Sequence, residues 1–393
     1  MNYVDFVMLK YPPPTPGESV SVVSEMPSSS DSKITSTYSE SFQNLLESQG
    51  VLPASSDSPP LNEQEIRERL EVPRASLSPS RFPDEDVRAF QKELRHSRTT
   101  ESGLQEAATR MLVGGYRFNG LHNLRFNNML PPVPATNTTN PQPDYYLGAP
   151  ANTVPQDIRD NLQRQIEPSL KRHCPLLPNY FIEYKPPSGN GDVAERQVTW
   201  DGCHGARALQ EYQSYGLAKP VIDNVARTFS VTVNGDHVQV YTHHTSVPKG
   251  GSQSIYHTFP IDADTLAGNP SRVRHTLAMT RNCADLADEL RATVVSATKQ
   301  RIETDENDQR LSSAGPNLSP ATLSPVQPTS SVTPILQASA SPNIEVGQQE
   351  IPQSWSPRRA NKNTRATGTR PQRQYRTTRR SSLKPQKKAV VTQ

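Results

Sequence analysis

Apolar residues recur at helix or strand spacing mainly between residues 82 and 300 of the chain. At the start of this region they fall three or four positions apart, which predicts two helices. The first helix carries Phe82, Val87, Phe90 and Leu94. The second runs from Leu104 to Leu112 and ends at Gly114-Gly115, a typical helix stop. A shorter helix is predicted upstream, in the segment LNEQEIRERLE.

Strands are predicted where aromatic and β-branched residues cluster, in the segments PDYYLGAP, LLPNYFIEYK, ARTFSVTV, HVQVYTHH and SIYHTFPI. Asn234-Gly235 between the third and fourth of these predicts a hairpin turn. Helices are predicted in VPQDIRDNLQRQIEPSL, in GDVAERQVTWDGCHGARALQEYQSYG and in PSRVRHTLAMTRNCADLADELRATVVSAT. In the second of these helices, Asp192 and Glu195 predict a capping box. Its small residues, among them Gly202 and Gly205, predict close packing on a sheet.

The composition predicts disordered arms on both sides of this region. The chain has 393 residues, of which 33% are hydrophobic and 37 are proline, with a mean hydropathy of −0.70, below ordinary globular values. We therefore expect a disordered Ser/Pro-rich arm at residues 1–81, one ordered domain at 82–300, a disordered Ser/Pro/Thr-rich linker at 301–357 and a basic tail at 358–393.

The net charge of +3 is unevenly distributed along the chain, because the last 43 residues contain 12 Lys or Arg and no acid. The tail (residues 358–388) is typical of a nuclear-import signal or of an arm that binds a polyanion such as nucleic acid, and a solvated tail without a partner is the alternative. We expect a nuclear protein, or otherwise a cytoplasmic one. Three cysteines without a CxxC pair favour a reducing compartment. We expect no membrane span, no secretion signal and no small-molecule cofactor.

The segment NYFIEYK is unusual because an acid and a base occupy an otherwise apolar strand. Alternate side chains of a strand share a face, so Glu183 and Lys185 point the same way, away from Ile182 and Tyr184. Burying an isolated charge costs several kcal/mol, so the pair needs a partner, a metal or water. An edge strand, or an ion pair at the rim of a sheet, is the simplest alternative.

Pro143-Asp144 precedes this strand, and Gln197 follows it on the next predicted helix. The order Pro-Asp, Glu-x-Lys, Gln resembles the PD-(D/E)xK nuclease superfamily. The strings PDYYLGA, PNYFIEYK, RQVTWDGCHGARAL and FSVTVNGDHVQVYTHH also resemble a fungal domain family assigned to that superfamily. The resemblance covers about residues 100–295. It implies a restriction-endonuclease-like α/β fold, in which helices flank a mixed sheet.

The resemblance also implies catalytic roles for Asp144, Glu183, Lys185 and Gln197. Asp144, Glu183 and the backbone carbonyl of Tyr184 would hold Mg²⁺, with Mn²⁺ as a substitute, because hard cations prefer oxygen ligands. Such an ion activates water for phosphodiester hydrolysis of DNA or RNA. Lys185 would orient that water or pair with phosphate oxygens, and Gln197 would hold the site or the nucleic acid. Glu106 is a further candidate ligand.

Other interpretations stay open at this stage. A catalytically inactive binding module of the same fold is the main alternative, and a disordered scaffold with Ser-Pro phosphorylation sites is a weaker one. Glu-x-Lys alone is a short pattern, and Asp31-Ser32-Lys33 matches it in a Ser-rich stretch. His243 and His244 should point to opposite faces of their strand and not share a metal. His173-Cys174 and Cys203-His204 lack the paired spacing that is typical of zinc ligands.

Overall fold

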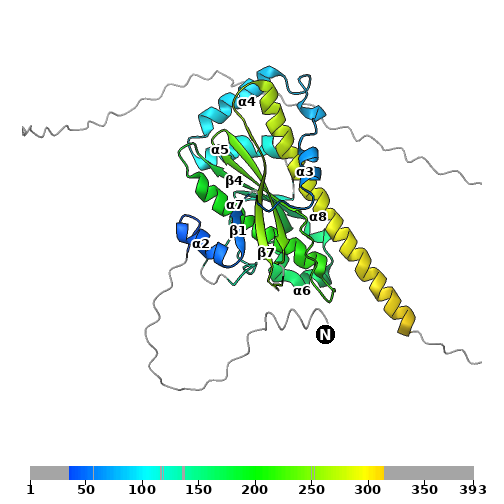
Figure 1. Ribbon diagram of the computed structural model, residues 1–393. Coiled ribbons are helices and arrows are strands. Elements are labelled where there is room, and N and C mark those ends of the chain that lie inside the picture. Colours follow the sequence, from blue (N-terminus) through cyan, green and yellow to red (C-terminus); the bar gives the residue numbers. More distant parts are fainter. Residues whose placement is uncertain are drawn as a thin grey trace, which may run out of the picture. The chain divides into compact units, whose positions relative to one another are not determined.

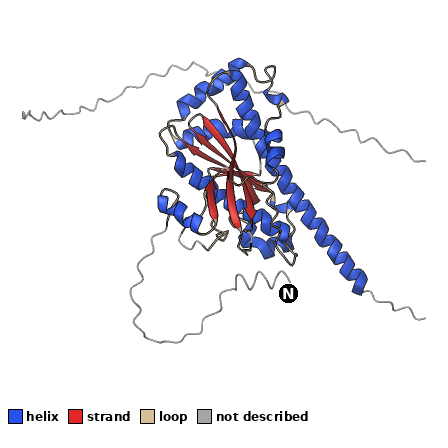
Figure 2. Ribbon diagram, viewed as in Figure 1, coloured by secondary structure: helices blue, strands red, loops and turns tan. Residues whose placement is uncertain are grey.

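The computed structural model describes residues 35–313, except residues 56, 116, 118, 135–137, 249 and 252. They lie in one compact unit, Met1–Leu318. In the described residues, seven strands form one mixed sheet in the order β1-β7-β6-β5-β4-β3-β2 (Figure 1). The strands are β1 (Val51–Ala54), β2 (Gly120–His122), β3 (Tyr145–Ala149), β4 (Leu176–Lys185), β5 (Thr228–Asn234), β6 (His237–Ser246) and β7 (Ile255–Thr265). The expected mixed sheet flanked by helices is confirmed (Figure 2).

β4 is an interior strand, antiparallel to β3 and parallel to β5. The chain crosses from β4 to β5 through helix α7 (Gly191–Ser214), as parallel neighbours require. Tyr180, Ile182 and Tyr184 of β4 belong to one hydrophobic core, while Phe181 belongs to a second core. Alternate residues of β4 therefore face two separate layers of helices.

The first layer contains α7 and α6 (Gln156–Ile166), with α2 (Glu40–Ser48) packed against α7. The second layer contains the long α8 (Pro270–Ser313) and three shorter helices, α3 (Glu63–Leu70), α4 (Asp84–Ser97) and α5 (Glu101–Val113). Two short 3₁₀ turns, η1 (Ala75–Leu77) and η2 (Ala151–Thr153), complete the connections. Among the described residues, no helix combines the length and the apolarity needed to cross a membrane.

The predicted close packing of α7 on the sheet is confirmed. A Cβ atom at Gly202 would lie 2.2 Å from the His243 ring, and one at Gly205 would lie 2.8 Å from the carbonyl oxygen of Pro178. The predicted capping box was wrong in position. Asn190 caps the helix, because its side chain accepts a hydrogen bond of 2.8 Å from the Asp192 amide, so Asp192 lies inside the first turn.

The predicted disordered arm at 1–81 was wrong for residues 35–81. β1 pairs in parallel with β7, and Phe42, Leu46, Val51 and Ile66 are buried. The helix predicted in LNEQEIRERLE is confirmed as α3. α2 and β1 are only nine and four residues long, too short for a period to emerge from a polar segment. The domain also continues past residue 300, because α8 ends at Ser313. The predictions for residues 1–34 and 314–393, including the basic tail, lie outside the described residues.

The N-terminal elements should therefore contribute to stability. Phe42 is fully buried, with its ring edge-on to Trp200 of α7 at a centroid distance of 6.0 Å. Phe42→Ala should lower the free energy of unfolding by about 3–5 kcal/mol, measured by urea denaturation. Ser41→Ala, at an exposed position of the same helix, should change it by less than about 0.5 kcal/mol. Equal stability of the two variants would refute the role given to α2.

Candidate active site

Glu183 and Lys185 lie on the α7 side of β4, and both are almost completely buried. The exposed fraction is 1% for Glu183 and 4% for Lys185. β4 lies between β3 and β5 and so is not an edge strand, although its pairing with β3 ends at Ile182 and Glu183–Lys185 pair with β5 only. Water cannot solvate either charge freely, so the protein itself must supply their partners.

Asp144 lies immediately before β3. Its side chain continues the hydrogen bonding between the β3 and β4 segments beyond the end of β3. The amide of Tyr184 donates to Asp144 Oδ2 at 2.8 Å. In return the amide of Asp144 donates to Glu183 Oε1 at 3.3 Å. The Tyr184 ring anchors this arrangement on the opposite face, where its hydroxyl group lies 2.8 Å from that of Thr109 on α5. The predicted proximity of Asp144 and Glu183 is thus observed.

Lys185 is held by three oxygen atoms. Its Nζ donates to the carbonyl of Tyr184 at 2.8 Å and to Glu101 Oε2 at 3.2 Å, and it lies 3.7 Å from Glu183 Oε2. Burial alone would lower the pKa of Lys185, but the carboxylates of Glu183, Asp144 and Glu101 outweigh burial and raise it. Lys185 is therefore a stable cation at neutral pH.

Glu101 was missed by the sequence analysis, which considered Glu106 on the same helix. Glu106 is exposed to solvent, whereas Glu101 is the first residue of α5 and reaches Lys185. The side chain of Glu101 is 43% exposed, so it forms the outer end of the site. Helical spacing shows which residues share a face, but not which end of a helix meets a strand.

Asp201 of α7 was also missed. It lies one turn after Gln197 and is 2% exposed. The carboxyl groups of Glu183 and Asp201 lie close enough to form a hydrogen bond when one is protonated. Glu183 Oε2, Asp201 Oδ2 and Gln197 Oε1 are buried atoms without a hydrogen-bond partner in the described structure. Gln197 itself is partly exposed, and no hydrogen bond is observed between it and Asp144, Glu183 or Lys185.

Burial sets the protonation of the three carboxyl groups. It raises the pKa of Asp144 to about 6, against the opposing effects of the Tyr184 amide and Lys185. It raises the pKa of Asp201 to about 8, and it raises that of Glu183 well above the ordinary value, with Asp144 and Asp201 adding repulsion. Two adjacent buried carboxylates cannot easily both ionise, so the Glu183–Asp201 pair keeps at least one proton at neutral pH.

The oxygen donors fit a hard cation. No group of three or more His, Cys, Asp or Glu side chains in the described residues is arranged to hold an ion. Mg²⁺ does not require such a group, because it commonly takes one or two carboxylates and retains water. Glu183 Oε2 has no hydrogen-bond partner, and the Tyr184 carbonyl faces the same strand edge as its amide. Asp144, Glu183 and this carbonyl are therefore the residues that would hold the ion.

The chain was compared with known families, curated proteins and solved structures. The family described as Domain of unknown function (DUF7924) matches residues 80–297, more than half of the chain. The chain belongs to this family. No curated protein and no solved structure matches it significantly. The DUF7924 match contains every residue of the site described above, but it begins after α2, β1 and α3.

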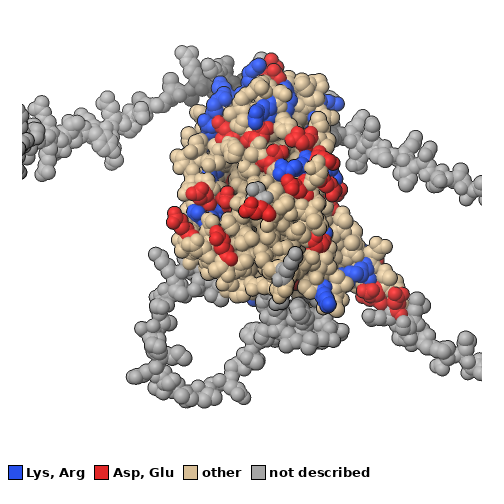
Figure 3. All heavy atoms as spheres, viewed as in Figure 1, with Lys and Arg blue, Asp and Glu red and all other residues tan. Residues whose placement is uncertain are grey.

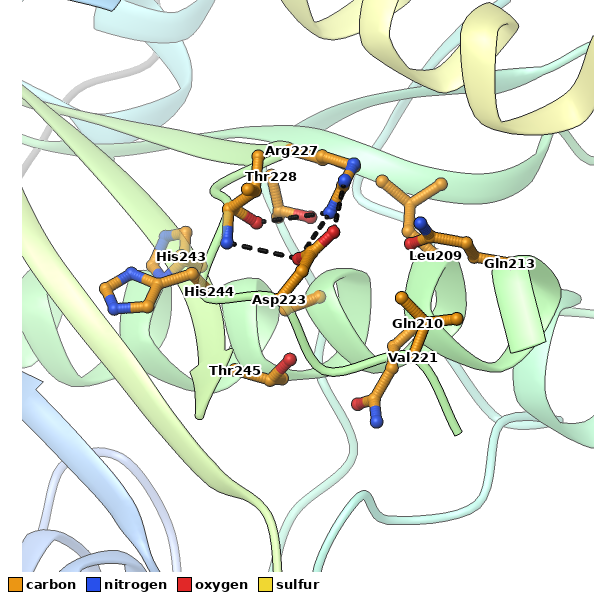
Figure 4. Close-up of a pocket in the computed structure, with 12 residues that line it drawn as sticks. Leu209, Gln210, Gln213, Val221, Asp223, Arg227, Thr228, His243, His244 and Thr245 are labelled. Carbon is orange, nitrogen blue, oxygen red and sulfur yellow. Dashed lines mark hydrogen bonds and ion pairs between the residues drawn. The ribbon is translucent and has the colours of Figure 1, made fainter. Parts of the chain in front are cut away.

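The other polar candidates in the DUF7924 domain have structural partners. His243 lies 2.7 Å from the Ser230 hydroxyl, whereas the ring of His244 stacks on His257 at a centroid distance of 4.8 Å. The predicted opposite orientation of the two histidines is confirmed. Figure 4 shows the small pocket beside them, where Asp223 binds Arg227. Thr228 lines this pocket and begins β5, whereas Asn234 ends β5 beside Lys185. The pocket is therefore far from the carboxylates.

The cysteines of the DUF7924 domain are free thiols, and all three are buried. Cys174 lies 3.3 Å from the Tyr146 hydroxyl. Nδ1 of His204, which follows Cys203, bonds to the Trp200 carbonyl at 2.9 Å. One member of each His-Cys pair, Cys174 and His204, thus has a partner within the protein.

The raised pKa of Asp201 predicts how stability depends on pH. A carboxyl that is protonated in the folded state and ionised in the unfolded state makes stability fall as pH rises from about 4 to about 8. Asp201→Asn keeps a donor toward Glu183 but removes this titration. The free energy of unfolding of Asp201→Asn should decline less over this pH range than that of the wild type. At pH 8 it should exceed the wild-type value by at least about 1 kcal/mol.

Urea denaturation between pH 4.5 and 8.5 measures this difference. Asp192→Asn is the matched control, because Asp192 is an exposed acid on the same helix. The control should follow the wild-type profile. Parallel profiles for Asp201→Asn and the wild type would contradict the raised pKa of Asp201.

Proposed function

We propose that the DUF7924 domain of this chain is a metal-dependent phosphodiester hydrolase that acts on DNA or RNA, with Mg²⁺ as the ion and Mn²⁺ as a substitute. The observation that carries this proposal is the reciprocal pair of hydrogen bonds between the Asp144 and Tyr184 segments. They bring Asp144, Glu183 and Lys185 together at the ends of two adjacent strands. Two carboxylates and one ammonium group suit the binding of a cation and a phosphate.

The order of the elements supports the same proposal. Helix α5, the strand that follows Asp144, the strand with Glu183 and Lys185, and helix α7 with Gln197 occur in the order that the PD-(D/E)xK resemblance implies. α5 and α7 contribute acids from opposite sides of the strand end, namely Glu101 and Asp201. The resemblance does not include Asp201, which the DUF7924 domain adds to the pattern.

In the proposed mechanism, Asp144, Glu183 and the Tyr184 carbonyl would hold the ion. A bound Mg²⁺ supplies an acidified water and stabilises charge on the phosphate. Lys185 pairs with a non-bridging phosphate oxygen, for which it must exchange Glu101. This exchange is feasible because the Glu101 side chain is 43% exposed, so its carboxylate stays solvated when it leaves Lys185. Beside a bound cation, the ionised form of Glu183 would be favoured, with a proton of the pair retained on Asp201. Gln197, on the turn before Asp201, would hold the site together from the α7 side.

Cleavage of labelled oligonucleotides tests the proposal. The full chain should cleave DNA or RNA with Mg²⁺ or Mn²⁺. Glu183→Gln and Lys185→Met should each lower the rate by about 100-fold or more, because each removes a group that acts on the transition state. Glu106→Gln, an exposed substitution on α5, should retain the rate. Equal rates in the wild type and both site variants would refute the proposal.

The second candidate is an inactive module that keeps the fold for binding. The near-complete burial of Glu183 and Lys185 favours it, because a substrate phosphate must first open the outer end of the site. Thermal melting with Mg²⁺ distinguishes the two. Saturating Mg²⁺ should raise the Tm by several degrees, since 100-fold excess over Kd contributes about 2.7 kcal/mol.

The Mg²⁺-induced rise in Tm should be larger at pH 8 than at pH 5.5, because protons compete with the ion for Asp144, whose pKa is raised to about 6. Glu183→Gln should abolish the rise at both pH values. A rise in Tm without any cleavage would favour the inactive module. Absence of a rise in the wild type would remove the metal from the proposal.

A further inference from the structure

Helix α4 carries a row of cations on its exposed face. Arg88, Lys92 and Arg95 are spaced four and three residues apart, so they share one side of the helix. All three are exposed, and in Figure 3 Lys and Arg side chains gather over α4. We call these three residues the α4 basic stripe. The stripe has no role in the core, which α4 contacts through Val87, Phe90 and Leu94.

Most of the charge of the stripe is not neutralised by the protein. Within the described residues, Lys92 and Arg95 form no ion pair. Arg88 lies 3.6 Å from Asp84, a weak exposed contact, and Asp84 also binds Arg274 at 2.5 Å. The acids exposed on α4 are Glu85, at its start, and Glu93, about a quarter turn from Lys92. The stripe is therefore available to an external anion.

The residues that follow the stripe at the C-terminal end of α4 are connected by contacts to the carboxylate site. Arg98, which caps α4, pairs with Asp236 in the β5–β6 turn. The preceding residue of this turn, Gly235, donates its amide to the Lys185 carbonyl at 2.8 Å. Three residues after Arg98, Glu101 bonds to Lys185 Nζ at 3.2 Å. Two independent contacts thus connect the end of α4 to Lys185.

We propose that the α4 basic stripe binds the phosphate backbone of the nucleic-acid strand whose scissile phosphate enters the site. This inference rests on the proposed function. From Arg88 to Arg95 the stripe covers seven residue-to-residue steps of helix, or about 10 Å, which matches about three nucleotides at 3.4 Å of axial rise per strand. Lys and Arg on an exposed helix face contact phosphates and carry no sequence information by themselves. Binding through the stripe is therefore independent of sequence.

The salt dependence of binding tests this surface. A fluorescein-labelled 20-nucleotide strand is titrated with full-length protein in EDTA, which prevents cleavage, and anisotropy is followed from 50 to 300 mM salt. Arg88→Gln/Lys92→Gln/Arg95→Gln should reduce the slope of log K against log salt by about 2, since each phosphate contact contributes about 0.7–0.9. The basic tail contributes equally to every variant, so the difference isolates the stripe.

The matched control is Lys171→Gln/Arg172→Gln/Lys299→Gln, which removes the same charge elsewhere. Lys171 and Arg172 are exposed and lie before the start of β4, whereas the site is at the end of β4. Lys299 is exposed on α8. The control should change the slope by less than 1. Equal slopes for the two triple variants would overturn the inference. The inference would also be overturned if the stripe variant lost more affinity for phosphatidylserine vesicles than for the oligonucleotide.

Cleavage in Mg²⁺ separates this inference from the proposed function. The stripe variant should raise the KM about tenfold and leave the kcat unchanged, because the stripe binds the substrate away from the reacting phosphate. If the wild type does not cleave but the slope changes only in the stripe variant, hydrolysis is refuted and the binding surface is upheld. If the wild type cleaves and the stripe variant has an unchanged KM, the inference fails and the proposed function stands.

Discussion

A carboxylate on an interior strand is stable only if its surroundings compensate for the loss of water, and Glu183 imposes this requirement on the elements around it. The amide of Asp144 donates to one of its oxygens, Lys185 lies beside the other, and the adjacent Asp201 keeps the pair from ionising fully. These partners come from the residue before β3, from β4 and from α7. The requirement thus links the end of the sheet to the helix that covers it.

The close approach of α7 serves the same arrangement. Gly202 and Gly205 bring the helix near the sheet, and Asp201, next to Gly202, is thereby brought to Glu183. On the other side, α5 reaches the strand end through Glu101, which is partly exposed. The site is consequently closed toward α7 and accessible from the α5 side, where the end of α4 also lies. This asymmetry defines the direction from which a phosphate could approach.

The strands were predictable because β-branched and aromatic residues concentrate in them, and the predicted segment LLPNYFIEYK coincides with β4. Alternation along the strand and the preceding Pro-Asp indicated Asp144, Glu183 and Lys185. Asp201 and Glu101 were not predictable, because their roles depend on which turn of a helix lies over the strand end. α2 and β1 were missed for a related reason: β1, for example, gains its stability from β7 and α7, which are distant in sequence.

The amide of Tyr184 has a further consequence. It lies where β3 no longer continues, and it donates to Asp144 Oδ2 instead of to a strand carbonyl. A hydrogen bond to a carboxylate is stronger than one to its protonated form. The nuclear magnetic resonance shift and the exchange rate of this single amide should therefore follow the charge on Asp144. The backbone of β4 thus contains an internal indicator of ionisation, which can be observed without a substrate and without a change in sequence.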